Sequence, residues 1–268
     1  MIEEELTMKN IMSLFKKQKP KIEFCSEIIG IEKIMPIIPA KDLPLDWVKR
    51  AIANVKKEGL IQTGINTKAN ITRCPGIISS RTQGWIVRLH QDLELTINGN
   101  DINWKTPIDD QKYSFDMLEP TVNIFQDYVF HQFMKRWPKG ANPMVVKINT
   151  PWHVRIPKGY KMLQTMPAFG DENRFHTITG IVEEEHGIVK LNFPMYWFEQ
   201  GKTLLEQGTP LAQLILIKQE HIEMEQSHME INPKFKEIFQ TNWYNLRSTF
   251  TRNYTKIKDR WRNITDGR

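Results

Sequence analysis

The chain has 268 residues, 40% of them hydrophobic, so it is long enough to bury the core of one large domain or two small ones. Its net charge of +6 equals the excess in residues 232–268 alone, nine Lys and Arg against three Asp and Glu, which excludes a uniformly basic nucleic-acid-binding body. The acidic start argues against a signal peptide, and the lack of an apolar run of about 18 residues argues against a membrane span. Two cysteines are too few for a disulfide framework, so we expect a cytoplasmic protein.

Residues 1–21 predict a tail or a short helix, to which we assign no function. A β-rich globular domain is then expected over residues 22–220. Near its start, Asp46 can cap an amphipathic helix whose apolar stripe includes Trp47 and Val55 and which ends at Gly59. We expect this stripe to pack on a sheet.

From residue 71 the pattern changes to strands. Apolar residues alternate with polar ones between residues 85 and 97, and the alternation resumes at Ile102 after Asn98-Gly99-Asn100. Asn and Gly tolerate the positive φ of a tight turn, so residues 71–104 predict a hairpin region with one buried face.

A second β block covers residues 145–218, after a stretch of ambiguous type at 116–137. Pro and Gly turns separate most of its short runs, which lie at 145–148, 153–156, 160–164, 177–182, 188–195 and 211–218. Strands at this spacing, without a βαβ rhythm, indicate a mainly β (α+β) fold, an antiparallel β-sandwich or jelly roll with flanking helices.

Motifs in this block resemble those of the dUTPase and dCTP deaminase family. The stretch 180–187, GIVEEEHG, is similar to the family's Gly-Val-Ile-Asp pattern, and the stretch 208–214, GTPLAQL, is similar to its Ala-Gln-Leu strand. The stretch 156–160 resembles the family's opening turn, in the same order. The resemblance covers about a quarter of the chain and implies a dUTPase-like β region over 145–218.

The same resemblance implies candidate catalytic residues. The family's Asp that orients the attacking water corresponds to Glu183, and its Tyr that stacks on the pyrimidine corresponds to His186. The longer side chain of Glu183 displaces the carboxylate by about an ångström, which weakens a positioned base. The family's phosphate-holding Ser-Ser segment and glycine-rich arm have no match, so a nucleotide-binding or nucleotide-hydrolysing enzyme is the alternative hypothesis.

Further residues with site-like chemistry surround this turn. His176 and Arg174 can converge with Glu183 and His186 on one pocket, or the four can belong to a charged surface loop. The polar run 79–84 can present backbone donors to an anion or form an ordinary loop. The candidate ligand-binding residues are Arg81, Arg174 and Gln213.

A metal site is not expected. His221, Glu225 and His228 can share one helix face, but their acidic neighbours favour a solvated surface. We therefore expect neither a metal nor another cofactor.

Residues 221–268 predict a basic helical arm. Asn232-Pro233 is a good helix start, and apolar residues then recur at spacings of four and three along one stripe. The stripe can pack on its own sheet, bind a protein partner or a second copy, or, with its cations, bind nucleic acid or an anionic membrane surface. The candidate partner-binding residues are Trp243, Phe250, Tyr254, Trp261, Arg247 and Arg252.

Most of the chain also resembles a family of proteins from tailed bacteriophages and some bacteria that carries no established activity. The matching stretches are 74–79 with Gly84-Trp85, Pro151-Trp152 with 157–160, and 192–194 before the strand at 208–214. This resemblance implies a phage-type protein in the host cytoplasm or in a virion. The leading hypothesis is therefore a non-enzymatic virion or assembly component that acts through protein–protein contacts of residues 233–268, with nucleic-acid binding by the arm as a further alternative.

Overall fold

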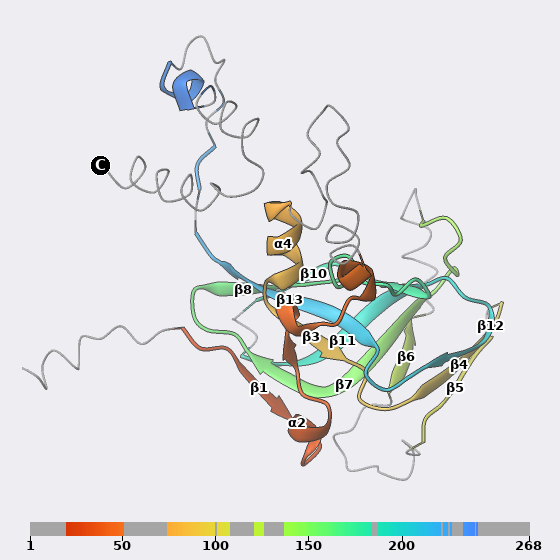
Figure 1. Cartoon of the computed structure of the whole chain (residues 1–268). Coiled ribbons are helices and arrows are strands. Elements are labelled where there is room, and N and C mark those ends of the chain that lie inside the picture. The colour runs from red at the N-terminus through yellow and green to blue at the C-terminus, as the bar shows by residue number, and fades with distance from the viewer. Residues whose placement is uncertain are drawn as a thin grey trace, which may run out of the picture.

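A computed structural model describes residues 20–50, 74–99, 101–107, 121–125, 137–183, 187–220, 222–224, 226, 233–238 and 240. Two antiparallel five-stranded sheets and one three-stranded sheet make up most of this part of the chain (Figure 1). Helices within the described residues are few and short. The predicted class is confirmed: the protein is mainly β, with a sandwich-like α+β arrangement.

The first sheet is built around one long strand. Its strands are β1 (Glu23–Ser26), β7 (Val145–Arg155), β11 (Ile188–Trp197) and β9 (Phe175–Thr177) in that order, and β6 (Val122–Phe125) also pairs with β7. In β7, Val146, Ile148 and Val154 are fully buried, and only Lys147, His153 and Arg155 along the strand are not buried.

A bulge interrupts the pairing of β7 with β11. Lys190 lies opposite His153 and Asn192 opposite Asn149, so residues 150–152 together face Leu191. Thr150 fills this bulge: its Oγ1 donates to the Leu191 carbonyl at 2.8 Å and accepts from the Trp152 amide at 3.3 Å. The expectation of two separate strands at 145–148 and 153–156 is therefore wrong, because the bulge lets one strand continue through Pro151.

The second sheet has the order β10 (Gly180–Glu183), β8 (Tyr160–Thr165), β13 (Pro210–Lys218), β3 (Trp85–Arg88) and β2 (Ile38–Pro39). The single strand expected at 177–182 is divided. β9 belongs to the first sheet and β10 to the second, so the chain crosses between the two sheets at Ile178 and Thr179.

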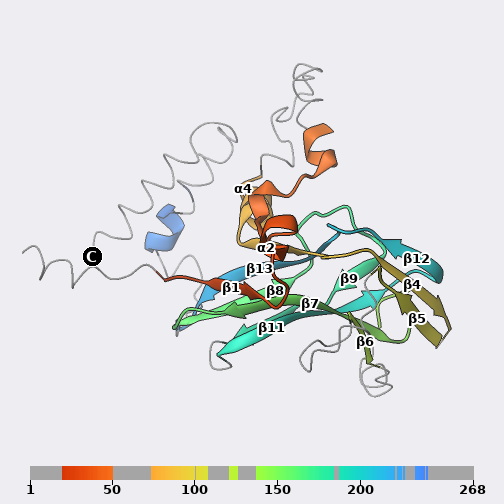
Figure 2. The same cartoon turned by 90° about the horizontal axis from the view of Figure 1, so that it is seen from below.

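The expected hairpin forms the third sheet. β4 (Leu93–Asn98) pairs with β5 (Asp101–Lys105) and with β12 (Gly201–Leu205), and Asn98 lies opposite Asp101 across the turn. Figures 1 and 2 both show this sheet at one end of the two larger sheets. All three sheets contribute to one core, in which the rings of Phe175 and Trp197 stack with centroids 5.9 Å apart.

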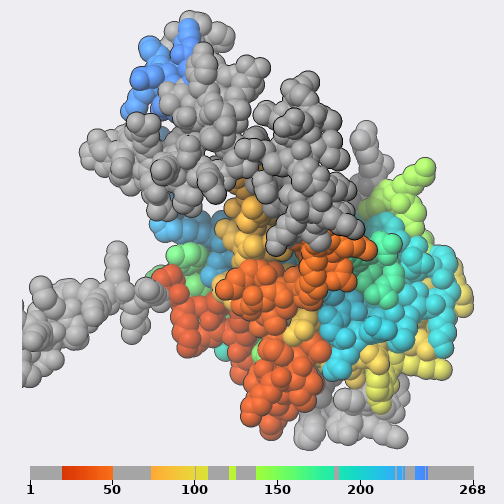
Figure 3. All heavy atoms as spheres, in the orientation of Figure 1, coloured from red at the N-terminus to blue at the C-terminus, as the bar shows by residue number. Residues whose placement is uncertain are grey.

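A second, smaller core lies on the far side of the second sheet. Ile86 points away from the main core and packs against residues 40–48, among them Leu45 and Val48. The 3-10 helix η1 (Ala40–Asp42) and a helical stretch at 46–50 belong to this region, whereas the α-helix α2 (Ile31–Ile34) packs into the main core through Ile31. Trp47, a residue of the predicted stripe, packs against this small core, whereas Val55 and the rest of the stripe lie outside the described residues. Figure 3 shows residues 20–50 in red and orange across the front of the molecule.

Residues 75–82 are helical rather than extended or looped. The helix α4 (Pro75–Thr82) replaces the strand pattern expected from residue 71 and most of the loop expected at 79–84. Proline at the first helical position favours this start because its ring presets φ and its missing N–H has no helical partner there. In the part of the chain that the structure describes, no helix is long and apolar enough to cross a membrane.

Candidate functional site

Two of the residues predicted to form a catalytic cluster, Glu183 and His176, lie in different sheets. Glu183 is in β10 of the second sheet, directly opposite Lys161, whose Nζ lies 2.5 Å from Glu183 Oε1. His176 is in β9 of the first sheet, exposed and opposite Tyr196. His186 lies outside the described residues, so the convergence of the four predicted residues on one pocket stays a prediction.

Arg174 is held by a neighbouring carboxylate. Its Nε and Nη2 donate to the two oxygens of Glu172 at 2.8 and 2.6 Å, and its Nη1 donates to the Leu204 carbonyl at 2.6 Å. Burial alone would raise the pKa of Glu172, but the hydrogen bonds and charge of Arg174 lower the pKa overall. The same pair raises the pKa of Arg174. Arg174 thus ties the loop before β9 to β12.

Gln213 is a buried structural link between three segments. Its Oε1 accepts from the Ala168 amide at 2.9 Å, and its Nε2 donates to the carbonyls of Ser80 and Gln83, both at 2.7 Å. These bonds hold the end of α4 on β13, and a ligand at Gln213 would have to replace one of them. Arg81 lies in the last turn of the same helix and is half-buried.

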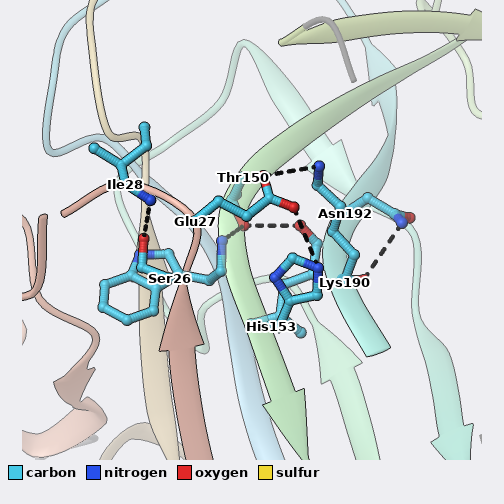
Figure 4. Close-up of polar contacts among 9 residues, drawn as sticks. Ser26, Glu27, Ile28, Thr150, His153, Lys190 and Asn192 are labelled. Atoms are coloured by element: carbon cyan, nitrogen blue, oxygen red, sulfur yellow. Dashed lines mark hydrogen bonds and ion pairs between the residues drawn. The ribbon is translucent and has the colours of Figure 1, made fainter. Parts of the chain in front are cut away.

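A polar cluster that spacing along the chain does not reveal lies on the outer face of the first sheet. Figure 4 shows the carboxylate of Glu27 between His153 and Lys190. Oε1 of Glu27 lies 3.3 Å from His153 Nε2, and Lys190 Nζ donates to Oε2 at 3.2 Å. The three side chains are only 17–26% exposed, so contacts with one another replace much of their contact with water.

The register of the sheet brings this cluster together. His153 pairs across the ladder with Lys190 on one side and with the exposed Cys25 on the other, beside the bulge at Thr150. Glu27 follows β1 directly, and its amide donates to the Pro151 carbonyl at 2.9 Å. Because both partner groups already face a carboxylate, we read the cluster as an electrostatic tie that holds the edge strand β1 on β7.

A partly exposed apolar surface lies on the outer face of the second sheet, where Ile181 is exposed and Leu163 and Ile215 are half-buried. Val182, Met162 and Leu216 pack against the main core, so the residues beside them point outward. Outward residues in register across β10, β8 and β13 form what we call the apolar row, which consists of Ile181, Leu163 and Ile215. Ile181 is 58% exposed.

The apolar surface continues along the chain beyond the sheet. Ile217, one step further on the same face of β13, is 42% exposed, and Ile222 and Met224 after the strand are 80% and 81% exposed. Large apolar side chains that gather on a surface typically mark a contact site. The six predicted partner-binding residues, from Trp243 to Trp261, lie outside the described residues.

No family model and no curated protein sequence matches the chain. Among solved structures, it is similar to a point mutant of the dUTPase from phage phi11 of S. aureus, with a TM-score of 0.31 and 12% identity. The match covers 63% of this chain and 94% of that chain. A likeness at this level carries no argument about the fold or the activity.

Proposed function

We propose that the protein acts through protein–protein contacts made by its C-terminal segment, residues 221–268. The observation that carries the proposal is the series Ile217, Ile222 and Met224, which presents large apolar side chains to solvent where the chain leaves β13. Covering such side chains with a partner lowers the free energy by about 25 cal/mol for each Å² of apolar surface removed from water.

The composition of the segment supports a protein partner. Downstream of Met224 it contains the aromatic and arginine residues that dominate the binding energy of protein interfaces, such as Trp243, Tyr254 and Arg247. Its excess of cations suits the polar rim of such an interface. A place in a virion or in its assembly is the finer form of the proposal, which the phage-type sequence resemblance favours.

The test uses the full chain with a photo-cross-linking residue in place of Met224. On irradiation, alone and in a bacterial cell extract, we expect discrete covalent protein adducts, identified by mass spectrometry. The matched control carries the same residue in place of Ile34, which is 69% exposed in α2. Adducts at position 224 no more abundant than those at position 34 would overturn the proposal.

Two other outcomes would replace the proposal with one of its alternatives. Pyrophosphate release from a deoxynucleoside triphosphate and Mg²⁺, abolished by Glu183→Ala, would identify a nucleotide enzyme. Binding to DNA or RNA that falls steeply with salt and disappears on deletion of residues 233–268 would identify a nucleic-acid-binding arm.

A further inference from the structure

We infer that Arg88 binds a small oxyanion, a single carboxylate or phosphate group, on the outer face of the second sheet, with His90 beside it. Arg88 is the last residue of β3 and lies far along the chain from residues 221–268, so this site is independent of the proposed function. Its ligand is one anionic group rather than a protein surface.

The alternation of side chains places Arg88 and His90 on the same face. Val87 and Leu89 are fully buried in the main core. Arg88 and His90 therefore point to the opposite face of the sheet, which carries the small core. Leu89 is still paired with the sheet, because its amide donates to the Thr209 carbonyl at 2.8 Å. The two half-buried side chains thus start about 7 Å apart on one extended segment, at the rim of an apolar core.

The guanidinium of Arg88 carries a positive charge that no carboxylate balances. Its Nη2 donates to the Pro36 carbonyl at 3.0 Å, and its Nε is buried without a hydrogen-bond partner. Across the residues that the structure describes, no Asp or Glu side chain forms an ion pair with it. Burial lowers the pKa of Arg88, as expected for a cation that is partly removed from water without a counter-charge.

Prolines surround this position in the sheet. Pro210 of β13 pairs with Arg88 on one side, and the carbonyl that accepts from Arg88 belongs to Pro36. A proline ring offers no side-chain acceptor and no backbone N–H. The nearest strands therefore leave the donors of Arg88 without a polar side chain to receive them.

Arg174 shows how the same chain satisfies another half-buried guanidinium. Its Nε and Nη2 donate to the two oxygens of Glu172, and its Nη1 donates to a carbonyl. All three nitrogens of Arg174 have an acceptor, whereas Arg88 has one acceptor for three nitrogens. The remaining acceptors of Arg88 must then come from outside the chain.

An oxyanion supplies what water cannot. Water can accept hydrogen bonds from the exposed nitrogens of Arg88, but it brings no counter-charge. The planar fork of a guanidinium matches two oxygens of a carboxylate or phosphate, and such ionic hydrogen bonds are stronger at a half-buried place than in water. His90 adds a second donor on the same face. Retaining an unbalanced cation costs stability, which a neutral residue would avoid, and binding an anion gives that cost a function.

The experiment observes the Nε–H signal of Arg88 by NMR in the ¹⁵N-labelled full chain, assigned by its loss in Arg88→Met. Inorganic phosphate or acetate is added at constant ionic strength. We expect the signal to shift and saturate at a concentration at least about tenfold lower than at the exposed Arg50, the gain from one additional ionic hydrogen bond. A shift with phosphate alone assigns a phosphate ligand, a shift with acetate alone a carboxylate, and a shift with both a general oxyanion site.

Thermal unfolding tests the same site through the variant. Without added anion, we expect Arg88→Met to melt at the same temperature as the parent or higher, since it removes an unbalanced cation. The anion that binds should raise the melting temperature of the parent and of the control Arg50→Met, but not that of Arg88→Met.

Two results would overturn the inference. One is an Arg88 signal that fails to shift or that responds at the same concentrations as Arg50. The other is a melting temperature that the anion raises equally in the parent and in Arg88→Met. If Arg88→Met does not fold, Arg88→Lys replaces it for the assignment, and the comparison of Arg88 with Arg50 in the parent still decides.

Discussion

Gly84 shows how closely two segments approach in the second sheet. Its φ is +76°, and a Cβ at this position would lie 1.9 Å from the carbonyl oxygen of Leu214. Its own carbonyl accepts a hydrogen bond from the Ala40 amide at 2.9 Å, so the residue also anchors the N-terminal region. Both the backbone conformation and the space therefore require glycine.

We predict that Gly84→Ala lowers the free energy of unfolding by about 3 kcal/mol or more, since it combines an unfavourable φ with a backbone clash. Urea denaturation measures the effect. Gly159→Ala is the matched control: φ is +79° there, but nothing lies within 4 Å of the added Cβ, so a loss of only about 1 kcal/mol is expected. Equal losses in the two variants would contradict the close approach.

Glu172 links stability to pH. Its pKa in the folded protein is below the ordinary value, so its carboxylate stabilises the fold above the unfolded pKa of about 4.3, and this contribution is lost as pH falls through the lower folded pKa. We predict that Glu172→Gln costs about 2 kcal/mol at pH 7, and that the difference from the parent shrinks below about pH 4.

Thermal unfolding of both proteins between pH 3 and pH 8 checks this pattern. The control is the exposed neighbour Asp171, where Asp171→Asn should change stability by less than about 0.5 kcal/mol. A Glu172→Gln deficit that is the same at pH 3 and pH 7 would show that the carboxylate charge is not the cause.

Residue identity alone predicts part of what is seen at Gly84 and nothing of the contacts of Glu27. Glycine before a strand suggests a special backbone conformation at position 84, but the clash with Leu214 depends on a partner 130 positions further along the chain. Likewise, Glu27 meets His153 and Lys190 only because β1, β7 and β11 adopt one register. The candidate site missed by sequence reasoning is thus a product of long-range pairing, which a one-residue shift would abolish.

At the scale of single elements, β1 depends on side-chain ties. It is a four-residue edge strand that pairs with β7, and Glu27 lies directly after it. We predict that Glu27→Gln lowers the free energy of unfolding by about 1 to 2 kcal/mol, because His153 and Lys190 lose their carboxylate while remaining half-buried. Hydrogen exchange of the amides of residues 23–26 should accelerate in the variant.

Glu23 supplies the comparison within the same strand. It contacts Lys21 and Arg155, whose side chains are 78% and 62% exposed, so water screens these pairs. Glu23→Gln should therefore cost less than about 0.5 kcal/mol and leave the exchange of β1 nearly unchanged. If Glu23→Gln lowered the free energy of unfolding as much as Glu27→Gln, the contacts of Glu27 would stabilise β1 no more than exposed ion pairs do.

Strands with clear alternation could be predicted from the sequence, and short ones could not. β4, β5, β8 and β11 follow the expected runs because apolar residues on one of their faces pack into the core, and β13 follows its run although Leu211 to Leu214 are buried on both faces. β1 has four residues and too few alternating positions to stand out. The division between β9 and β10 could not be predicted because the apolar pattern continues across the point where the chain changes sheets.

At the scale of the whole molecule, the class was predictable but the assembly of sheets was not. Regular spacing of turns indicated an antiparallel sandwich, and the three sheets confirm it. Which strands become neighbours depends on the packing of all inner faces at once, so β13 between β8 and β3 could not be anticipated. The apolar row follows from that order, since it exists only where three particular strands align.

The central place of β13 also has a consequence for biosynthesis. β3 emerges from the ribosome early but pairs with β13, whose last residue is Lys218, so the second sheet stays unfinished until most of the polypeptide has been translated. β1 likewise waits for β7, more than a hundred codons downstream. Pairings this distant slow folding and leave apolar strands uncovered on the nascent chain.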